Sequence, residues 1–275
     1  MSLIEFKNIV KSYKPGKNVI QGLNLDIEEG EFVALLGPSG CGKTTLLKMV
    51  NKLIKLDSGN ILVKGKDINQ WNTIDLRRNI GYVIQQIGLF PHMTIEDNIN
   101  YVLTLKKSKM DYKSNRAKEL IGLVGLTEEF LYRYPRELSG GQKQRIGVAR
   151  ALAANPDIIL MDEPFGAVDE IARTHLQDEL INIQQKLKKT IIFVTHDIQE
   201  ALKLGSKIVL LNEGKIEQAG NKEELIFDPS SDFVKDFIGL KGFKAVLDDE
   251  VMQKIYMNVL NGELNMKELY EQLYA

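Results

Sequence analysis

One stretch of the chain has the residue types and spacing of a phosphate-binding loop, G-x-x-x-x-G-K-[ST]. Its glycines let the backbone curl so that successive N–H groups point inward at phosphate oxygens, and the following helix adds its N-terminal partial positive charge. We expect Lys43 to reach the β- and γ-phosphates of ATP, Thr44 to ligate Mg²⁺, and Thr45 to contact the nucleotide. The loop consists of Gly37, Pro38, Ser39, Gly40, Cys41, Gly42, Lys43 and Thr44.

Cys41 lies inside this loop and is the only cysteine of the chain. A single cysteine cannot form an intrachain disulfide, which favours a reducing cytosol. A helix N-terminus favours the thiolate, so we expect Cys41 to be alkylated readily and bound Mg-ATP to slow that reaction. The alternative is a buried, inert thiol.

Two acidic residues follow the apolar residues 158–161, which have the pattern of a buried strand. Ligands of open α/β sheets bind at the carboxyl ends of the strands, so Asp162 and Glu163 are expected beside the phosphate loop. Successive side chains of a strand point to opposite sides, which suits the two acids to different roles. Asp162 would hold Mg²⁺ through water, and Glu163 would polarise the attacking water. His196 ends another apolar run, residues 190–195, where a contact with the γ-phosphate is expected.

These residues need strands and helices to position them. Residues 3–10 and 19–27 are predicted to be short strands, and residues 31–36 a buried strand that ends at the loop. Strand patterns alternate with helical ones, which predicts an α/β fold with a mostly parallel sheet covered on both faces. Residues 44–54 are predicted to form a helix after the loop. The side chains on its apolar face are Leu46, Leu47, Val50, Leu53 and Ile54.

Residues 88–155 are mainly helical in pattern, and we interpret them as a helical subdomain inserted into an α/β domain of residues 1–240. In residues 115–124 the apolar side chains share one helical face. Those side chains are Ala117, Leu120, Ile121 and Val124. Beyond Gly239 the strand patterns end; Asp248 is predicted to cap a helix within a short helical tail, residues 241–275.

Composition excludes several classes of protein. The chain has 275 residues and a net charge of -1, without the basic excess of a nucleic-acid-binding surface. Its apolar runs are far shorter than the roughly 18 residues that cross a bilayer. The first residues lack the basic and apolar regions of a secretory signal.

Residues 138–142 read Leu-Ser-Gly-Gly-Gln, and with them the chain resembles the nucleotide-binding subunits of ATP-binding cassette (ABC) transporters. The resemblance covers about residues 3–240, with every motif in the family's order. It implies a P-loop NTPase fold of the ABC type with a mixed sheet. It also implies hydrolysis of Mg-ATP by a head-to-tail dimer of two copies. In that dimer Ser139, Gly140, Gly141 and Gln142 would close over the γ-phosphate bound by the other copy.

The resemblance also assigns roles to other residues of the sequence. Tyr13 matches the aromatic residue that stacks on adenine, and Asp169 matches the aspartate that crosses the dimer interface. His196 matches the switch histidine. Gln85 matches the glutamine that touches Mg²⁺ and senses the membrane subunit, although Gln86 follows directly and the register could differ by one.

A narrower resemblance, on residues 48–54 and 80–94, is to importer subunits for quaternary-amine osmolytes such as glycine betaine, carnitine and choline. It implies transmembrane permease subunits as partners, indirect work with a substrate-binding protein, and a peripheral position at the cytoplasmic face of the membrane. Other small solutes, such as amino acids, polyamines or sugars, are the alternative. The residues after Gly239 are too few for the tandem CBS module that many members of this group carry.

Three further readings compete with an importer ATPase: a non-transport ABC ATPase in DNA repair or translation, a non-enzymatic subunit and a P-loop GTPase. A DNA-repair ABC ATPase would carry long heptad coiled coils, and a translation factor would usually carry two cassettes; the sequence has neither. A non-enzymatic subunit would have a damaged site, yet Lys43 and Glu163 are present. A P-loop GTPase is disfavoured because residues 51–54 lack the aspartate of the guanine-reading motif.

Overall fold

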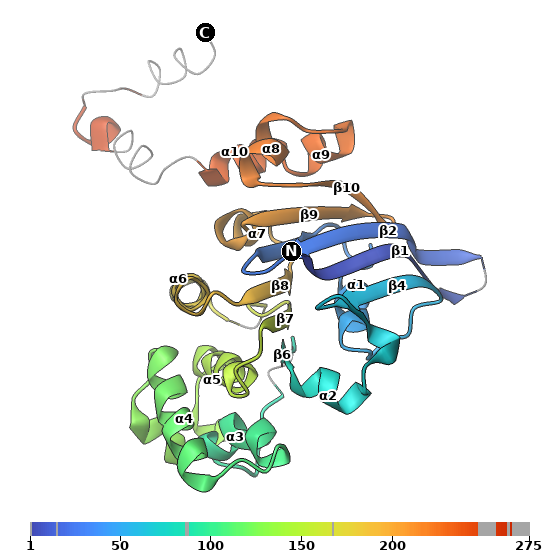
Figure 1. Ribbon diagram of the computed structural model, residues 1–275. Helices are drawn as coiled ribbons and strands as arrows, with labels where there is room; N and C mark the ends of the chain where they lie inside the picture. The colour runs from blue at the N-terminus through green and yellow to red at the C-terminus, as the bar shows by residue number, and fades with distance from the viewer. Residues whose placement is uncertain are drawn as a thin grey trace.

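The computed structural model describes residues 2–14, 16–85, 88–166, 168–246, 257–262 and 265. Its main body contains a six-stranded sheet in the order β10-β9-β3-β8-β7-β6 (Figure 1). Strands β9, β3, β8, β7 and β6 run parallel, and β10 is antiparallel to β9, so the predicted mixed sheet is confirmed. The strands are β3 (Phe32–Leu36), β6 (Ile80–Val83), β7 (Ile158–Asp162), β8 (Thr190–Val194), β9 (Lys207–Asn212) and β10 (Lys215–Gly220).

A second, four-stranded antiparallel sheet has the order β2-β1-β4-β5. The first two predicted strands are longer than expected, because β1 and β2 pair along their whole length from Ser2 opposite Glu28 to Lys14 opposite Lys17. The hydrophobic pattern predicts strand ends where the apolar residues stop. Backbone hydrogen bonds between β1 and β2 continue past those residues and lengthen both strands. The strands are β1 (Ser2–Lys14), β2 (Lys17–Glu28), β4 (Ser58–Val63) and β5 (Lys66–Asp67).

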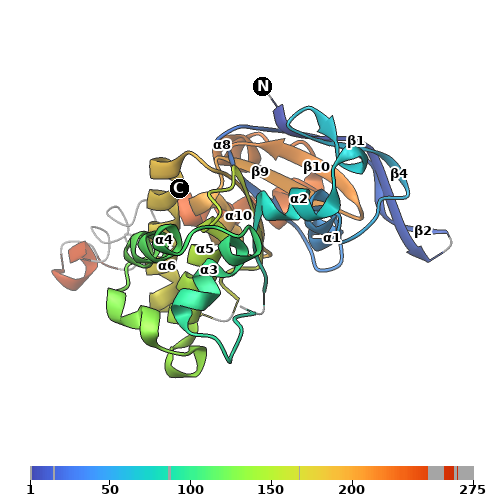
Figure 2. The same cartoon turned by 60° about the horizontal axis from the view of Figure 1, so that its bottom comes forward.

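Helix α1 (Lys43–Val50) fills the space between the two sheets. Its side chains Leu46, Leu47 and Val50 are fully buried, as predicted, in a core shared with β1, β2 and one face of the six-stranded sheet. The opposite face of that sheet carries a second core, covered by helices α3 (Ile95–Leu105), α5 (Gly140–Leu152) and α6 (Glu170–Leu187) (Figure 2). Helix α7 (Ile198–Leu204) also contributes to this core. The six-stranded sheet is therefore covered on both faces.

The helix after the loop ends earlier than predicted, so the expected placement of Leu53 on its buried face is wrong: Leu53 is 48% exposed. Lys52 adopts a left-handed backbone with φ of 55°, which ends the helical path. The side chain of Arg77 donates hydrogen bonds to the carbonyls of Asn51 and Lys52 at 3.1 and 2.9 Å. These bonds satisfy carbonyl groups that a longer helix would have used.

Residues 88–155 fold mainly as helices that lie together at one end of the molecule (Figure 1). In α4 the predicted apolar face is buried, from Ala117 to Val124. The helices and turns between β5 and β7 are η1 (Ile68–Gln70), α2 (Thr73–Arg78), α3 (Ile95–Leu105), α4 (Met110–Leu123), η2 (Glu128–Tyr132), η3 (Pro135–Glu137) and α5 (Gly140–Leu152).

The chain after β7 adds helices that pack on one face of the six-stranded sheet and helices that contact β10 at its edge. Helix α10 contacts α7, α8 and α9, so the beginning of the predicted tail is packed against the folded body. Asp248, the predicted cap of a helix in the tail, lies outside the described residues, and residues 257–260 of the tail are helical. In the part of the chain described, no helix is long and apolar enough to cross a membrane. The helices are α6 (Glu170–Leu187), α7 (Ile198–Leu204), α8 (Lys222–Phe227), α9 (Asp232–Phe237) and α10 (Gly239–Val246).

Candidate active site

The predicted phosphate loop connects β3 to α1, and two of its glycines have no room for a side chain. Gly37 has φ of 145°, and a Cβ there would lie 2.1 Å from the carbonyl oxygen of Leu211. Gly42 has φ of 110°, and its Cβ would lie 2.5 Å from Ile20. The loop therefore takes a path open only to glycine, with α1 beginning at its end. This backbone cradle at a helix N-terminus fits the phosphates of a nucleotide.

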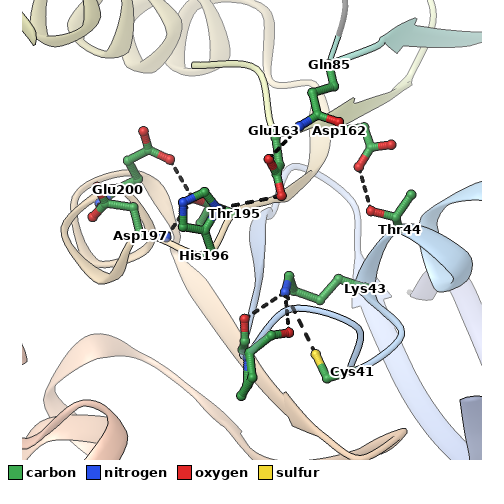
Figure 3. Close-up of polar contacts among 12 residues, drawn as sticks. Cys41, Lys43, Thr44, Gln85, Asp162, Glu163, Thr195, His196, Asp197 and Glu200 are labelled. Atoms are coloured by element: carbon green, nitrogen blue, oxygen red, sulfur yellow. Dashed lines mark hydrogen bonds and ion pairs between the residues drawn. The ribbon is translucent and has the colours of Figure 1, made fainter. Parts of the chain in front are cut away.

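Lys43 is buried and its ammonium lies across the loop. Its Nζ donates hydrogen bonds to the carbonyls of Gly37 and Pro38 at 2.7 and 2.9 Å (Figure 3). The positive charge is thus held at the centre of the curled backbone, where a phosphate would meet both the ammonium and the loop N–H groups.

Cys41 belongs to the loop, and its side chain is buried, with Sγ 3.8 Å from Nζ of Lys43. Burial raises the pKa of the Cys41 thiol, and the charge of Lys43 only partly offsets that effect. The expectation of a favoured thiolate is therefore wrong. Desolvation of the thiolate exceeds the stabilisation that the helix N-terminus and the lysine provide.

Oxygen atoms suited to Mg²⁺ meet beside the loop. The hydroxyl of Thr44 donates to Oδ1 of Asp162 at 2.8 Å, and Nζ of Lys48 lies 3.3 Å from Oδ2. Asp162 ends β7 and is buried. Among the residues described, no group of three or more His, Cys, Asp or Glu side chains could hold a metal. One carboxylate and one hydroxyl fit Mg²⁺, because this ion commonly takes its other ligands from phosphates and water.

Glu163 follows Asp162 and lies between two polar side chains from neighbouring loops (Figure 3). Its Oε2 accepts a hydrogen bond from Nε2 of Gln85 at 2.8 Å, and its Oε1 lies 3.6 Å from Nδ1 of His196. Glu163 has φ of 45°, a left-handed conformation that is costly for a residue with a side chain and is concentrated at functional sites. The structure places Gln85 at Glu163, and Gln86 lies outside the described residues.

The order of the strands explains why these distant residues meet. The phosphate loop, His196, Glu163 and Gln85 follow β3, β8, β7 and β6, which are consecutive parallel neighbours in the sheet. Their carboxyl ends lie along one edge, where open α/β sheets bind ligands.

Tyr13 lies at the far end of β1, and its ring is 58% exposed. Its hydroxyl is 3.2 Å from Oγ1 of Thr45, so the structure brings it to the loop as expected of an aromatic residue near the nucleotide. A cavity of about 600 Å³ also opens on the loop and is lined by residues that the sequence analysis missed. Those from β2 are Lys17, Asn18, Val19 and Gln21; no motif distinguishes them in the sequence.

The Leu-Ser-Gly-Gly-Gln motif of residues 138–142, here called the signature, lies at the start of α5, which is therefore called the signature helix. Ser139 is the N-cap, and it exchanges hydrogen bonds with Gln142 in a capping box, at 3.3 and 2.9 Å. Helix α5 belongs to the core on one face of the six-stranded sheet and α1 to the core on the other. Ser139, Gly140 and Gly141 are therefore separated by the sheet from the helix that follows the phosphate loop of the same chain.

Asp169 caps α6, with its Oδ1 accepting from the N–H of Ala172 at 3.0 Å. A Cβ on Gly141 would lie 3.4 Å from Cβ of Ala172 and 3.7 Å from Val168. The start of the signature helix thus packs directly on the segment that presents Asp169, and the two predicted interface motifs form one surface.

Residues 20–166 match the family model described as "ABC transporter". The chain belongs to this family. A carnitine transport ATP-binding protein, OpuCA of Listeria monocytogenes (strain 10403S), is 56% identical over 86% of this chain and 60% of its own length. A glycine betaine/carnitine/choline transport ATP-binding protein of Bacillus subtilis (strain 168) is 53% identical over 86% of this chain and 62% of its own length.

This ABC chain also resembles a solved structure. A dimeric, post-hydrolysis state of the ATP-binding cassette MJ0796 bound to ADP and Pi has a TM-score of 0.71, with 36% identity. The similarity covers 79% of this chain and 98% of the cassette. The P-loop fold of the ABC type, expected from the sequence, is confirmed. The chain spans only about 60% of the length of the curated relatives above.

Proposed function

We propose that this chain is the ATP-hydrolysing subunit of an ABC importer for quaternary-amine osmolytes. The observation that carries the enzymatic part is Glu163, which lies between Gln85 and His196 and directly follows the acid bonded to Thr44. A base, an orienting amide and an imidazole thereby meet at the edge of a phosphate loop. This arrangement suits in-line attack of water on a terminal phosphoryl group.

Each residue has a distinct task in the proposed reaction. Lys43 and the loop N–H groups bind the β- and γ-phosphates. Thr44, Asp162 and Gln85 would hold Mg²⁺, and the bound ion would neutralise phosphate charge and align the phosphates. Glu163 accepts a proton from the attacking water as that water bonds to the γ-phosphorus, while the bond from that phosphorus to the β–γ bridging oxygen breaks and ADP leaves. His196, across the carboxylate, donates a hydrogen bond to the γ-phosphate.

We propose that two copies of the chain assemble head to tail around two nucleotides. Each nucleotide would lie between the phosphate loop of one copy and Ser139, Gly140, Gly141 and Gln142 of the other. Within one chain the sheet separates the phosphate loop from residues 139–142. In the head-to-tail dimer the phosphate loop of each copy would instead face residues 139–142 of the other copy. The cassette MJ0796, described as a dimer with ADP and Pi, is the precedent. Tyr13 would stack on adenine, and Asp169 would approach the partner copy.

A groove beside Gln85 suits the permease partner. Its volume is about 280 Å³, and its apolar lining is flanked by Arg77, Arg78 and Arg150. A groove of this kind accepts an amphipathic helical segment. We place transmembrane permease subunits there, with the chain on the cytoplasmic face of the membrane. A substrate-binding protein would act on it only through the permease. The apolar lining includes Ile80, Tyr82, Ile84, Phe90, Tyr101 and Val102.

The solute class is proposed from the relatives, since two with more than half of their aligned residues identical are named for carnitine or for glycine betaine, carnitine and choline. These solutes carry a permanent cation, which an aromatic cage in the substrate-binding protein would recognise. The alternatives are importers of another small solute and, less favoured, a non-transport ABC ATPase.

The test is reconstitution of the chain in liposomes with the permease subunits and binding protein that copurify with it. ATP hydrolysis and solute uptake are measured together. The proposal predicts that both rise with a binding protein loaded with glycine betaine, carnitine or choline, whereas the isolated chain ignores these solutes. Stimulation by a sugar, an amino acid or a polyamine alone would overturn the solute class and leave the ATPase proposal intact.

A further inference from the structure

The loop that carries His196 is held by a buried carboxylate on the next helix. Thr195 donates a hydrogen bond from its Oγ1 to Oε2 of Glu200 at 2.5 Å (Figure 3). The same hydroxyl accepts from the N–H of Asp197 at 3.0 Å. Glu200 is only 7% exposed. Both neighbours of His196 in the sequence are therefore tied, through one hydroxyl, to Glu200.

The second oxygen of Glu200 leads to a different loop. Its Oε1 lies 4.0 Å from Nη1 of Arg173 on α6. Nη2 of Arg173 donates to the backbone carbonyl of Val168 at 3.2 Å. Val168 immediately precedes Asp169, and its side chain lies near Gly141. A single guanidinium thus connects Glu200 to the segment that presents the proposed interface aspartate and contacts the start of the signature helix.

The energetics of the pair distinguish it from a surface ion pair. Burial raises the pKa of Glu200, an effect that the Thr195 hydroxyl and Arg173 oppose. A buried carboxylate keeps its charge only while hydrogen-bonding and cationic partners stabilise it. The position of the Glu200 carboxylate therefore depends on the positions of Thr195 and Arg173. Arg173 and Glu200 also line a cavity of about 730 Å³, so shifts of these side chains are not prevented by close packing on every side.

We propose that Arg173 and Glu200 are positioning residues that couple the His196 loop to the Asp169 segment. The inference rests on the proposed ATPase function. Through this pair, the orientation of His196 at its own nucleotide is linked to the segment that approaches the partner copy. Among the described residues, neither side chain has a hydrogen bond or ion pair with the phosphate loop. The pair therefore acts through His196 and Asp169 on turnover and leaves nucleotide binding unaltered.

The test is a double-mutant cycle on the full chain, with Arg173→Met, Glu200→Gln and both together. Glu200→Gln retains an acceptor for Thr195 but removes the charge that faces Arg173. We expect kcat to fall about tenfold in each variant, since a misplacement of 1 Å can cost about a hundredfold. We expect KM for ATP to stay within about twofold of the wild-type value, because the contacts that bind ATP equally in the ground state and the transition state are unchanged. The double variant should fall no further than the more impaired single variant.

A matched control comes from Arg145 and Glu179, another partly buried pair that ends on α6, with Nη1 3.0 Å from Oε1. Arg145 donates to the carbonyls of Val124 and Gly125, far along the sequence from the site loops. Arg145→Met and Glu179→Gln should lower the urea midpoint of unfolding and leave kcat unchanged. Arg173→Lys, which keeps the charge but loses the forked donors, should recover part of kcat and serves as the second variant if Arg173→Met does not fold.

Three results would overturn the coupling: wild-type kcat in folded Arg173→Met or Arg173→Lys, additive losses in the double variant, or an equal loss in the control pair. Failure of the ATPase proposal is separate, because then the wild-type chain and Glu163→Gln would hydrolyse ATP equally slowly.

Discussion

The side-chain amide of Gln85 donates a 2.8 Å hydrogen bond to the carboxylate of Glu163. Gln85 follows β6 and Glu163 follows β7, so the bond joins the loops of two adjacent strands. It fixes one oxygen of the carboxylate and leaves the other facing the imidazole of His196. The proposed base is thus oriented from the same segment that borders the proposed permease groove.

Loss of this bond should slow turnover without weakening nucleotide binding. In Gln85→Ala we expect kcat to fall about ten- to a hundredfold, because the base is no longer held in its productive orientation. Steady-state hydrolysis at varied ATP concentration separates kcat from KM. Gln184→Ala is the control, since that side-chain amide donates to the backbone carbonyls of Gly30 and Lys189, away from the site. Wild-type kcat in Gln85→Ala would remove Gln85 from the orienting role.

Substitution of Gly37 should disrupt the phosphate loop. The new Cβ of Gly37→Ala would lie 2.1 Å from the carbonyl oxygen of Leu211, so the loop must shift away from β9. We expect ATP affinity to fall by more than about a hundredfold and the free energy of unfolding to drop by about 1–3 kcal/mol. Calorimetric titration with Mg-ATP and urea unfolding measure the two effects.

Gly65→Ala is the matched control for backbone strain alone, because Gly65 has φ of 71° and open space around its Cα. It should cost about 1 kcal/mol in unfolding and leave ATP affinity unchanged. Equal ATP affinities in both alanine variants and the wild type would contradict the claim that Gly37 shapes the phosphate-binding loop.

Cys41 should react slowly with an alkylating reagent, since its raised pKa leaves less thiolate at neutral pH than an ordinary thiol has. The rate should keep rising with pH beyond the point at which free N-acetylcysteine levels off. Bound Mg-ATP should slow the reaction further by covering the loop. Iodoacetamide labelling followed by mass spectrometry gives the rates, and labelling at least as fast as N-acetylcysteine at pH 7 would contradict the burial argument.

Helix α10 should support stability rather than nucleotide binding. Its Gly242 approaches Ile238 and Ile226 so closely that a Cβ would lie 2.5 and 3.2 Å from them, and the ring of Phe243 meets that of Phe227 edge to face. Truncation after Gly239 should lower the free energy of unfolding by about 1–3 kcal/mol, within the usual range for lost packing.

Truncation after Val246, which retains α10, is the comparison and should bind ATP with unchanged affinity. The catalytic motifs end by His196, so truncation after Gly239 should also bind ATP. A folded Gly239 truncation that cannot bind ATP would contradict this division of roles.

The phosphate loop and the acids after β7 were predictable because each belongs to a local motif with its own physical signature, whereas Tyr13, Gln85 and Asp169 were expected only from the family resemblance. A glycine-rich loop between a strand and a helix, and acids at a strand end, place phosphate and metal ligands without knowledge of the tertiary structure. Other features depend on distant residues. Arg77 ends α1 from 26 positions away, and the burial of Cys41 depends on the two sheets around it. The Arg173–Glu200 contact likewise appears only when α6 and α7 pack together.

The central claim is that Glu163 is the base of an ATPase site, and single-turnover and steady-state hydrolysis by Glu163→Gln test it most directly. Glutamine keeps the shape of the side chain and can still bond to Gln85, but it cannot accept the proton from water. We predict that turnover falls by about 10²–10⁴-fold, that Mg-ATP still binds, and that the ATP-bound dimer accumulates on size-exclusion chromatography. Glu179→Gln should hydrolyse ATP at the wild-type rate. Near-normal turnover in Glu163→Gln would contradict the account.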